Sequence, residues 1–525
     1  MKKGNPVLDC RVRRGKMATN EILMLAAIAA YLVIVLGVGI WCSKRNNTVD
    51  DFYLGGRRLG PFVTAMSAEA SDMSSWLLMG LPGVAYLTGI ADAAWTAIGL
   101  AVGTYINWLI VAKRIRNYSH VCKNSITLPD FFSNRYRDNK RILMCIAALV
   151  IIVFFVPYTA SGFAACGKLF SSLFGIDYQL AMVISAVVII GYTTIGGFLA
   201  ASTTDFIQSI VMTVALLVVF GFGISVAGGV DAVVENAKAL PGYLSLTETF
   251  NAETNSASPY GIITIISTLA WGLGYFGMPH VLLRFMAIEN SRKLKLSRRV
   301  ASVWVVISLA VGVLIGVIGL GMVNAGELAP LSDPETIMIQ IANLLSNNGW
   351  IAALVAGLIL AGILASTMST ADSQLLAASS SVSENIISGV FKLKTSPKKQ
   401  MIIARVTLVV IAVIGVFIAW DSNSSVFQIV SFAWAGFGAA FGPVVLFALF
   451  WKRSNLYGAL AGMLAGGVTV FVWKYLVRPL GGVWNIYELL PAFIVSCIFI
   501  VVVSLITKAP SKEIQDEFDT VKAMK

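Results

Sequence analysis

The sequence is poor in charged and titratable side chains. Only 13% of its 525 residues are Asp, Glu, Lys or Arg, against about a quarter in a typical soluble protein. It has two histidines, His120 and His280, and six cysteines with no close pair. Neither a transition-metal site nor a disulfide framework is therefore expected. No Walker motif is present, so nothing indicates ATP as an energy source. We expect no enzymatic activity and no cofactor.

Long apolar runs take the place of charge. The sequence is 57% hydrophobic with a mean hydropathy of +0.80, and residues 206–230 contain no charged residue at all. A run of about 20 apolar residues is long enough to cross a bilayer as a helix. These runs exclude a soluble enzyme, a disordered protein and a nucleic-acid binder, in spite of the net charge of +12.

The spacing of the runs predicts an all-α integral membrane protein with about 13 transmembrane helices. Short polar loops separate the runs and leave no room for a soluble domain between them. An odd number of spans puts the two termini on opposite sides of the membrane. The expected spans are 20–42, 61–88, 91–112, 142–167, 178–199, 205–228, 258–287, 300–324, 349–383, 401–420, 425–451, 456–477 and 486–507.

Basic residues predict the orientation. Lys and Arg gather in the loops after odd-numbered spans and in the tail 508–525, whereas the opposite loops hold only Lys168, Lys238 and Arg478. Basic loops stay in the cytoplasm, so we expect a cytoplasmic C-terminus and an external N-terminus. The basic tail 1–19 disagrees. It is either a cytoplasmic segment or, as we favour, the product of a mis-assigned start upstream of Met17.

Two of the expected spans are interrupted by Gly, Pro and polar residues, at 67–83 and 271–280. Backbone freed from helical hydrogen bonding is tolerated at membrane depth only where it lines a cavity or is buried in protein. Each interrupted span opens a block of five, and an odd number makes the second block inverted. Interrupted helices at matching positions of inverted repeats point to the binding site of a secondary transporter; the alternative is two kinked helices that only pack.

Polar groups at membrane depth are the candidate ion ligands. Asp72 lies near the middle of an apolar span and Glu69 lies three residues earlier on the same face. The pair predicts cation attraction, or one carboxyl group protonated because of the other; the alternative is a structural salt bridge. A second span carries hydroxyls on one helical face, which suit sodium or form a packing seam. They belong to Ser366, Ser369, Thr370 and Ser373.

Aromatic residues supply candidate walls for a solute pocket. Trp271 and Tyr275 are four apart on one helical face, and Tyr158 follows a proline in another span. Apolar walls with a few polar groups suit a small amphipathic solute, although an ordinary aromatic pair in a helix interface has the same spacing. Arg284, near the end of its span, is expected to extend to the membrane surface.

Several long stretches closely resemble the bacterial sodium/proline symporters of the sodium:solute symporter family. The resemblance implies the LeuT-type architecture, with inverted five-helix repeats at 61–228 and 258–451. One extra helix at 20–42 precedes the repeats and two more, within 456–507, follow them, so that the transporter domain spans 20–507. The matching stretches are 54–61, 70–83, 196–200 with Thr204 and Asp205, 271–280, 368–370 and 433–443.

The resemblance also implies site residues. Asp72 is implied as critical for sodium, with Arg57 and Ser74 supporting transport. Glu69 stands where glycine is usual in the family, so the resemblance does not explain it. Carbonyl oxygens of Ala70, Met73 and Ser366 and hydroxyls of Ser369 and Thr370 are implied for sodium, and Trp271, Tyr275, Pro279 and Tyr158 for proline.

Together these features predict a sodium-coupled symporter that takes up L-proline by alternating access in the bacterial plasma membrane. Its expected partners are sodium, proline and the lipid bilayer, with no nucleic acid and no obligate protein partner. Two alternatives stay open. One is a sodium- or proton-coupled symporter of another small amino acid or carboxylate, and the other is a solute sensor that does not transport.

Overall fold

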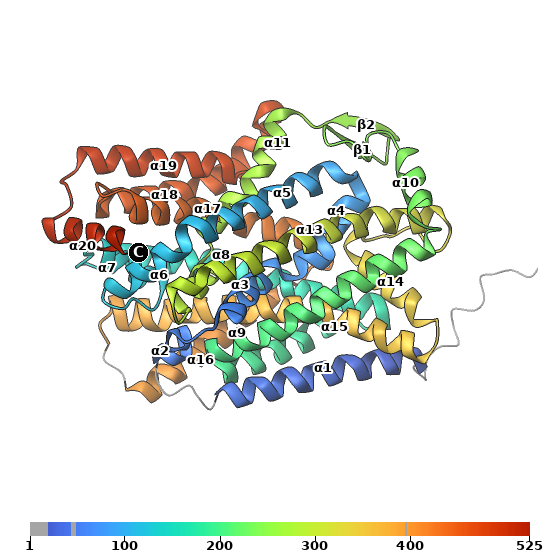
Figure 1. Ribbon diagram of the computed structural model, residues 1–525, viewed down its shortest axis with the longest axis horizontal. Helices are drawn as coiled ribbons and strands as arrows, with labels where there is room; N and C mark the ends of the chain where they lie inside the picture. The colour runs from blue at the N-terminus through green and yellow to red at the C-terminus, as the bar shows by residue number, and fades with distance from the viewer. Residues whose placement is uncertain (1–18, 44–48, 394–395, 525) are drawn as a thin grey trace, which may run out of the picture.

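The computed structural model describes residues 19–43, 49–393 and 396–524. Most of the expected basic tail 1–19 lies outside these residues. The described chain forms a bundle of long helices that run roughly along one axis (Figure 1). The α-helices are α1 (Thr19–Ser43), α2 (Val49–Leu54), α3 (Pro61–Ser75), α4 (Leu81–Thr88), α5 (Ile90–Ile106), α6 (Ala112–Val121), α7 (Leu128–Arg135), α8 (Ile142–Phe174), α9 (Tyr178–Val226), α10 (Val230–Lys238), α11 (Ile262–Leu269), α12 (Pro279–Ala287), α13 (Leu294–Asn324), α14 (Ile337–Ser346), α15 (Trp350–Ser380), α16 (Pro397–Ile418), α17 (Val426–Phe450), α18 (Leu456–Val472), α19 (Leu489–Ile506) and α20 (Lys512–Ala523).

Short 3₁₀ and π segments join or extend several of these helices. Those that matter for the site are the π segment η2, the π segment η3, the 3₁₀ segment η4 and the 3₁₀ segment η6. Their bounds are η2 (Trp76–Gly80), η3 (Asn107–Val111), η4 (Ala270–Phe276) and η6 (Pro334–Thr336), and the others are η1 (Gly55–Arg57), η5 (Ser291–Lys293), η7 (Ser381–Val390), η8 (Trp473–Val477), η9 (Arg478–Leu480) and η10 (Gly482–Trp484).

Every expected span coincides with a helical segment. Within the described residues, nine helices are long and apolar enough to cross a membrane, and one bent pair makes a tenth. The spans expected at 178–199 and 205–228 are joined in α9, where Gly197 (φ 67°) interrupts the helical backbone. Because other segments are shorter, such as Ile402–Ile418, the total of thirteen and the division into two repeats stay predictions.

The two interruptions predicted from sequence are confirmed. In the first, α3 breaks at Ser74, whose φ is 48°, and the chain continues through η2 into α4. In the second, α11 gives way to η4, and the helix axis bends by 44° before α12 begins at Pro279. Pro279 suits this place, because a proline at the first position of a helix lacks an N–H that would have no partner there.

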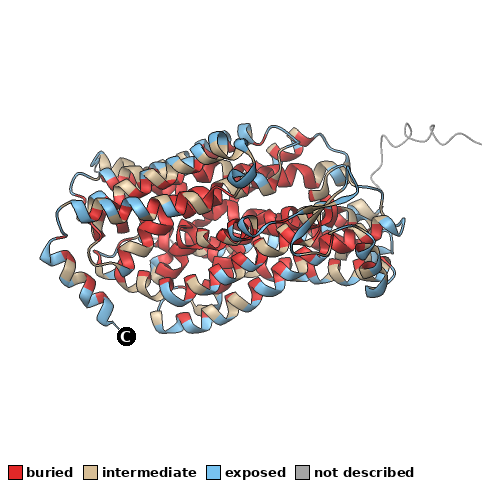
Figure 2. Ribbon diagram, turned by 90° about the horizontal axis from the view of Figure 1, so that it is seen from above, coloured by how far each residue is buried: buried red, intermediate tan, exposed pale blue. Residues whose placement is uncertain are grey.

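The buried centre of the bundle surrounds α15. This helix packs against α9, α1, α8 and α3, and Figure 2 shows buried residues along the whole length of the molecule. From Ile359 to Ser380 every residue of α15 is buried. The hydroxyl-rich face of α15 and the broken helix α3 therefore meet inside the protein, away from lipid.

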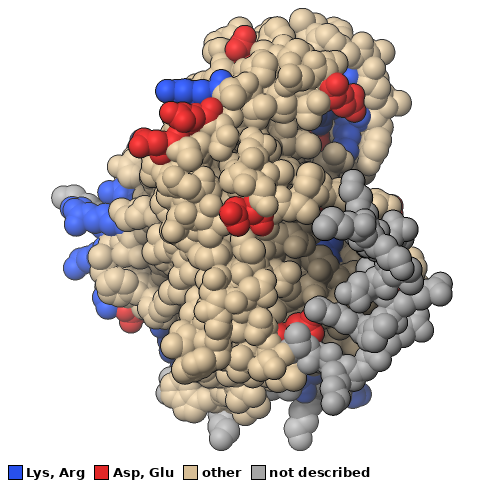
Figure 3. Space-filling view, turned by 90° about the vertical axis from the view of Figure 1, so that its right-hand side faces the viewer, with Lys and Arg blue, Asp and Glu red and all other residues tan. Residues whose placement is uncertain are grey.

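The two ends of the bundle carry small extra elements. One end bears α10 and the antiparallel hairpin of β1 (Glu248–Asn251) and β2 (Ser256–Pro259), in which Glu248 pairs with Pro259. Few Lys or Arg atoms lie on this end, which faces the viewer in Figure 3. The other end bears α2, α6, α7 and α20 (Figure 1).

Candidate ion and solute site

The break in α3 frees backbone oxygens in the middle of the bundle. A non-glycine residue with positive φ is disfavoured, and Ser74 is held there by the surrounding packing, with its Oγ accepting a hydrogen bond of 3.1 Å from the N–H of Trp76. The preceding residues Ala70, Asp72 and Met73 are all buried. Their carbonyl groups end a half-helix, which carries partial negative charge.

Ser369 connects this half-helix to α15. Its Oγ lies 2.8 Å from the carbonyl oxygen of Ala70 and 3.1 Å from that of Ser366. The hydroxyl of Thr370, the next residue, is buried and has no hydrogen-bond partner among the described residues. A buried hydroxyl without a partner is costly, so the hydroxyl of Thr370 favours a ligand.

Asp72 joins three segments. Its Oδ2 accepts a hydrogen bond of 2.6 Å from the hydroxyl of Tyr275 in η4, and its backbone oxygen accepts one of 3.1 Å from the hydroxyl of Tyr158 in α8. Its other carboxyl oxygen is buried and has no partner among the described residues. The residues implied for sodium and those implied for the solute are therefore connected through Asp72.

Glu69 faces a different neighbour. Its Oε1 accepts hydrogen bonds from Trp108 Nε1 at 2.7 Å and from Thr104 Oγ1 at 3.1 Å, both on the α5–η3 segment. Its Oε2 is buried without a partner, and no Lys or Arg in the described part of the chain forms an ion pair with it. Burial of a carboxylate without a counter-charge is expensive, which favours a proton or a cation at Glu69.

Aromatic rings cover the solute residues. The ring of Trp271 stacks on Tyr487 at 5.1 Å and lies 5.6 Å from Trp76 and 5.5 Å from Phe427. Trp434 Nε1 donates a hydrogen bond of 2.7 Å to the backbone oxygen of Trp271. This hydrogen bond satisfies a carbonyl group in the 3₁₀ segment η4 and fixes its position.

The space left beside these residues is small. A cavity of about 10 Å³ lies next to Ser74, Tyr158 and Thr370, between the broken helix, α8 and α15. That is room for about one water molecule and far less than an amino acid needs. The structure is therefore closed at this point.

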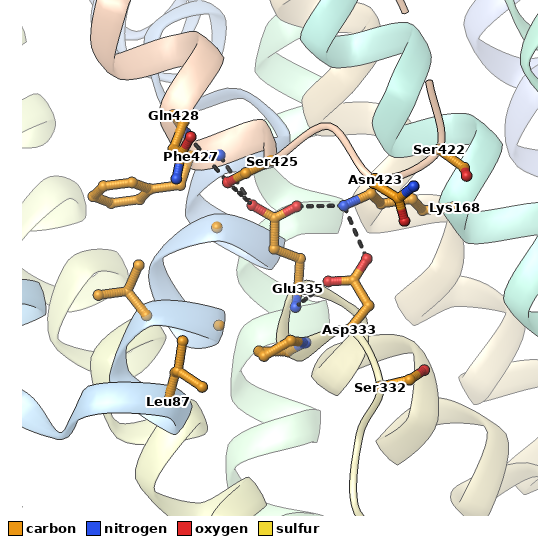
Figure 4. Close-up of a pocket in the computed structure, with 14 residues that line it drawn as sticks. Leu87, Lys168, Ser332, Asp333, Glu335, Ser422, Asn423, Ser425, Phe427 and Gln428 are labelled. Atoms are coloured by element: carbon orange, nitrogen blue, oxygen red, sulfur yellow. Dashed lines mark hydrogen bonds and ion pairs between the residues drawn. The ribbon is translucent and has the colours of Figure 1, made fainter. Parts of the chain in front are cut away.

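A larger cavity lies toward the end of the bundle that bears α10 (Figure 4). It measures about 370 Å³, and Gly80, Leu87, Lys168, Glu335 and Phe427 are among the residues that line it. The ring of Phe427 lies between this cavity and the deeper residues, because it lines the cavity and also contacts the rings of Trp76 and Trp271.

Glu335 organises the wall of this cavity (Figure 4). Its carboxylate accepts hydrogen bonds from Lys168 Nζ at 2.7 Å, from Ser425 Oγ at 2.9 Å and from the backbone N–H of Phe427 at 3.0 Å. Asp333 lies 2.8 Å from the same lysine nitrogen. A carboxylate at the N-terminus of α17 is favourable, and here it also holds Phe427 in place.

Arg57 lies apart from these groups. Its guanidinium donates to Met286 O at 2.6 Å, Ser125 O at 2.8 Å and Asn124 Oδ1 at 2.9 Å. None of these contacts involves Asp72. Burial, with a smaller contribution from neighbouring Arg116, lowers the pKa of Arg57 to about 10, so the group stays charged at neutral pH. It joins η1 to the loop that holds Asn124 and Ser125 and to the end of α12.

The expectation that Arg284 extends to the membrane surface is wrong. Its side chain is 1% exposed and its Nη2 lies 3.1 Å from Asp205 Oδ2 and 2.5 Å from Ser373 Oγ, while its Nε donates to Ser67 Oγ at 3.0 Å. A buried carboxylate in α9 provides the partner. Asp205, which directly precedes the uncharged run 206–230, was the signal in the sequence that could have predicted this partner. The aromatic partners Trp434 and Tyr487 leave no such signal in an apolar sequence.

Comparison with known proteins decides the family. A sequence profile described as the Sodium:solute symporter family matches residues 52–466. This chain belongs to the sodium:solute symporter family. Among its relatives, the "Sodium/proline symporter" of Haemophilus influenzae is 42% identical over 506 residues, covering 94% of this chain and 97% of the relative. The "Osmoregulated proline transporter OpuE" of Bacillus subtilis is 40% identical over 492 residues, covering 94% and 96%.

Solved structures share the fold. A Na⁺-coupled sialic acid symporter in a substrate-bound outward-open state superposes with a TM-score of 0.76 at 18% identity, covering 93% of this chain and 99% of that one. A nucleobase-cation-symport-1 family transporter in a closed conformation gives 0.50 at 14% identity, covering 89% and 98%. The predicted LeuT-type architecture of an α-helical integral membrane protein is thus confirmed, with one short β-hairpin besides the helices.

Proposed function

We propose that this protein is a secondary active transporter that couples the entry of sodium to the uptake of L-proline by alternating access. Family membership and relatives named as proline transporters support the proposal. The observation that carries it is the meeting of Ala70 O, Ser366 O and Ser369 Oγ, together with the buried hydroxyl of the next residue, Thr370, which has no partner among the described residues. These are hard oxygen ligands on two packed helices, which suit a small cation.

Sodium at this place would link α3 to α15. We assign it to the backbone oxygens of Ala70, Met73 and Ser366 and the hydroxyls of Ser369 and Thr370, with Asp72 supplying negative charge nearby. Because sodium bound there holds the half-helix of α3 in one position, it biases the bundle toward a state that accepts solute. Sodium is the coupling ion in this proposal.

Proline would bind between the two half-helices. The N-terminus of α12, which begins at Pro279, suits the carboxylate, and the free carbonyl groups at the end of the α3 half-helix suit the ammonium. Trp271 supplies an apolar wall for the ring, and Tyr158 and Tyr275 lie beside it. Because Tyr275 bonds to Asp72, proline and sodium bias the same arrangement. Each should raise the affinity for the other by the same factor.

The proposed orientation places the C-terminus in the cytoplasm and the N-terminus outside a bacterial plasma membrane. The bias of Lys and Arg toward one set of loops supports it. The cavity above Phe427 then opens toward the outside. Solute would enter there once the ring of Phe427 moves away from the two tryptophans.

Uptake into proteoliposomes tests the proposal. Labelled proline is offered with an inward sodium gradient, with an inward proton gradient, and with neither. Accumulation that requires the sodium gradient is expected, and excess unlabelled glutamate or alanine should leave it unchanged. Accumulation of proline without a sodium gradient would contradict the proposal. Binding of proline without any accumulation would also contradict it and would favour a sensor.

A second candidate is proton coupling through Glu69. The burial of this carboxyl group without a counter-charge favours it. In that case the proton gradient alone should drive uptake, and Glu69→Gln should abolish the proton-driven part and keep the sodium-driven part. Trp108 and Thr104, which donate to the same oxygen in both forms, make Gln a conservative replacement.

A further inference from the structure

A second, basic cavity lies at the opposite end of the bundle, between the η3 segment and the start of α13. It measures about 340 Å³. Four basic side chains contribute to its wall, from two segments far apart in sequence, together with apolar groups. The lining residues are Trp108, Leu109, Lys113, Ser291, Arg292, Leu294, Lys295 and Arg298.

The charges in this cavity are not paired with acids of the described residues. Within the described residues none of its four basic side chains forms an ion pair, and the nearby acid Glu289 is engaged with Lys293 at 2.6 Å. Four like charges around one hollow repel each other. The N-terminus of α13 adds partial positive charge. An anion in the cavity would relieve both effects.

The surroundings of the cavity are apolar and exposed. On α5 and η3, Tyr105 and Leu109 are 46% and 47% exposed, and on α13 Val303 and Ile307 are 61% and 49% exposed. The two helices pack against each other and lie side by side in Figure 1. The guanidinium of Arg298 lies over the ring of Tyr105 at 5.5 Å. In a membrane this strip faces acyl chains, and the basic cavity lies at its end.

We propose that this cavity binds the phosphate headgroup of an anionic phospholipid, with its acyl chains along the exposed strip of α5 and α13. In the proposed orientation the lipid belongs to the cytoplasmic leaflet. Arg and Lys recognise phosphate by charge-assisted hydrogen bonds. Basic pockets between membrane helices on this side bind such headgroups. The general excess of basic residues in cytoplasmic loops explains why these four side chains lie on this side of the membrane. It does not explain why they line one cavity with apolar residues beside it.

The lipid would also contact a residue that is hydrogen-bonded to Glu69, close to the proposed ion site. Trp108 is one of the residues that line the cavity, and its indole Nε1 donates to Glu69 Oε1 at 2.7 Å. Glu69 is one turn from Asp72 on α3. A bound headgroup that fixes Trp108 therefore fixes the partner of Glu69. We expect the anionic lipid to change the sodium dependence of uptake as well as stability; this part rests on the proposed function.

The test compares two double variants of the full chain. Lys295→Gln with Arg298→Gln removes two charges from the cavity, whereas Lys140→Gln with Arg299→Gln removes two exposed charges of the same end that do not line it. Each protein is placed in nanodiscs of phosphatidylcholine with increasing phosphatidylglycerol, and the rise in Tm gives the apparent lipid affinity. This readout does not require transport, so it stands even if the proposed function fails.

The wild type and the Lys140/Arg299 variant should be stabilised by phosphatidylglycerol alike. The cavity variant should need about 30-fold more of it, which corresponds to two basic groups at an anionic membrane surface. Its Tm in pure phosphatidylcholine should not fall below that of the wild type, because two repelling charges have been removed. An equal loss in both variants would overturn the proposal in favour of general surface charge. Stabilisation of the wild type by glycerol 3-phosphate in phosphatidylcholine nanodiscs, to the same extent, would overturn the lipid in favour of a soluble phosphate ester.

Discussion

At the scale of single residues, Asp72 carries two separable properties. Its negative charge can attract sodium, and its Oδ2 anchors η4 through the hydroxyl of Tyr275 at 2.6 Å. Asp72→Asn removes the charge and keeps an acceptor for Tyr275, whereas Tyr275→Phe removes the anchor and keeps the charge. The pair of variants therefore separates ion attraction from mechanical connection.

Asp72→Asn should lower the apparent affinity for sodium at least about tenfold, or about 1.4 kcal/mol, because the amide keeps an acceptor for Tyr275 but loses the charge. Tyr275→Phe should lower the apparent affinity for proline more than the apparent affinity for sodium. Sodium-dependent uptake of labelled proline at varied sodium gives both values. Unchanged sodium dependence in Asp72→Asn would remove Asp72 from the ion site.

Thr370 offers a test in which stability and function move in opposite directions. Its hydroxyl is buried and has no partner in the described part of the chain, so Thr370→Val should raise the free energy of unfolding by about 1 kcal/mol without sodium. It should also reduce the rise in Tm that sodium produces. The matched control is Thr367→Val, one turn earlier, where the hydroxyl donates to Ile363 O at 3.0 Å and its loss should destabilise. Identical behaviour of the two variants would mean that Thr370 holds no ligand.

At the scale of elements, η4 is held by backbone contact with α5. A methyl group at Gly103 would clash with the backbone of Gly272, and one at Gly272 with the backbone of Gly99. Small residues allow such close packing of membrane helices. The position of the 3₁₀ segment, and of Trp271 and Tyr275 on it, depends on these glycines.

Gly103→Ala should therefore lower the free energy of unfolding by about 1–3 kcal/mol and reduce proline affinity by displacing η4. Gly191→Ala is the matched control, because nothing lies within 4 Å of its added methyl; it should change stability by at most about 1 kcal/mol. Thermal unfolding and proline-induced stabilisation measure the two effects. An unchanged Tm and proline affinity in Gly103→Ala would show that η4 can shift to accommodate the added methyl group.

Glu335 tests how α17 is held at the outer cavity. Glu335→Gln keeps the shape but removes the charge that pairs with Lys168 and caps α17, and Asp333 still pairs with the lysine. We expect a loss of about 1–3 kcal/mol in unfolding free energy. The exposed Glu327→Gln at the same end should have no measurable effect. Equal Tm values for the two variants would count against this role.

At the scale of the whole molecule, α20 packs onto the end of the bundle opposite the hairpin. Phe518 is buried and lies 5.3 Å from the guanidinium of Arg114 and 5.6 Å from that of Arg135. Glu513 and Glu517 pair with Arg137 at 2.9 Å and 2.8 Å. The expected cytoplasmic tail 508–525 thus contains a docked helix, Lys512–Ala523.

Phe518→Ala should release this helix, at a cost of about 3 kcal/mol. Limited proteolysis with trypsin should then cut near Lys512 at least ten times faster than in the wild type, whereas Lys522→Ala, at an exposed position, should leave the cleavage rate at Lys512 unchanged. Equal protection in both variants would mean that α20 does not need Phe518 to dock.

Much of the architecture could be predicted because apolar length and Gly–Pro interruptions are visible along the chain. The breaks at Ser74 and before Pro279 belong to this class. The partners of each polar group could not be predicted, because they come from helices that are far apart in sequence. Asp205 pairs with Arg284 across 79 residues, and Trp108 reaches Glu69 from another helix. The docking of α20 depends on Phe518 and its cationic partners in the same way.

The docked helix α20 also constrains how the protein is made. Glu513 is added to the chain 376 residues after its partner Arg137, so Arg135 and Arg137 remain uncovered while most of the bundle is being inserted. A nascent chain that stalls before α20 would leave this basic, aromatic surface exposed, whereas a chain that includes α20 covers it. The surface that α20 covers is therefore closed only after residues 512–523 have been made.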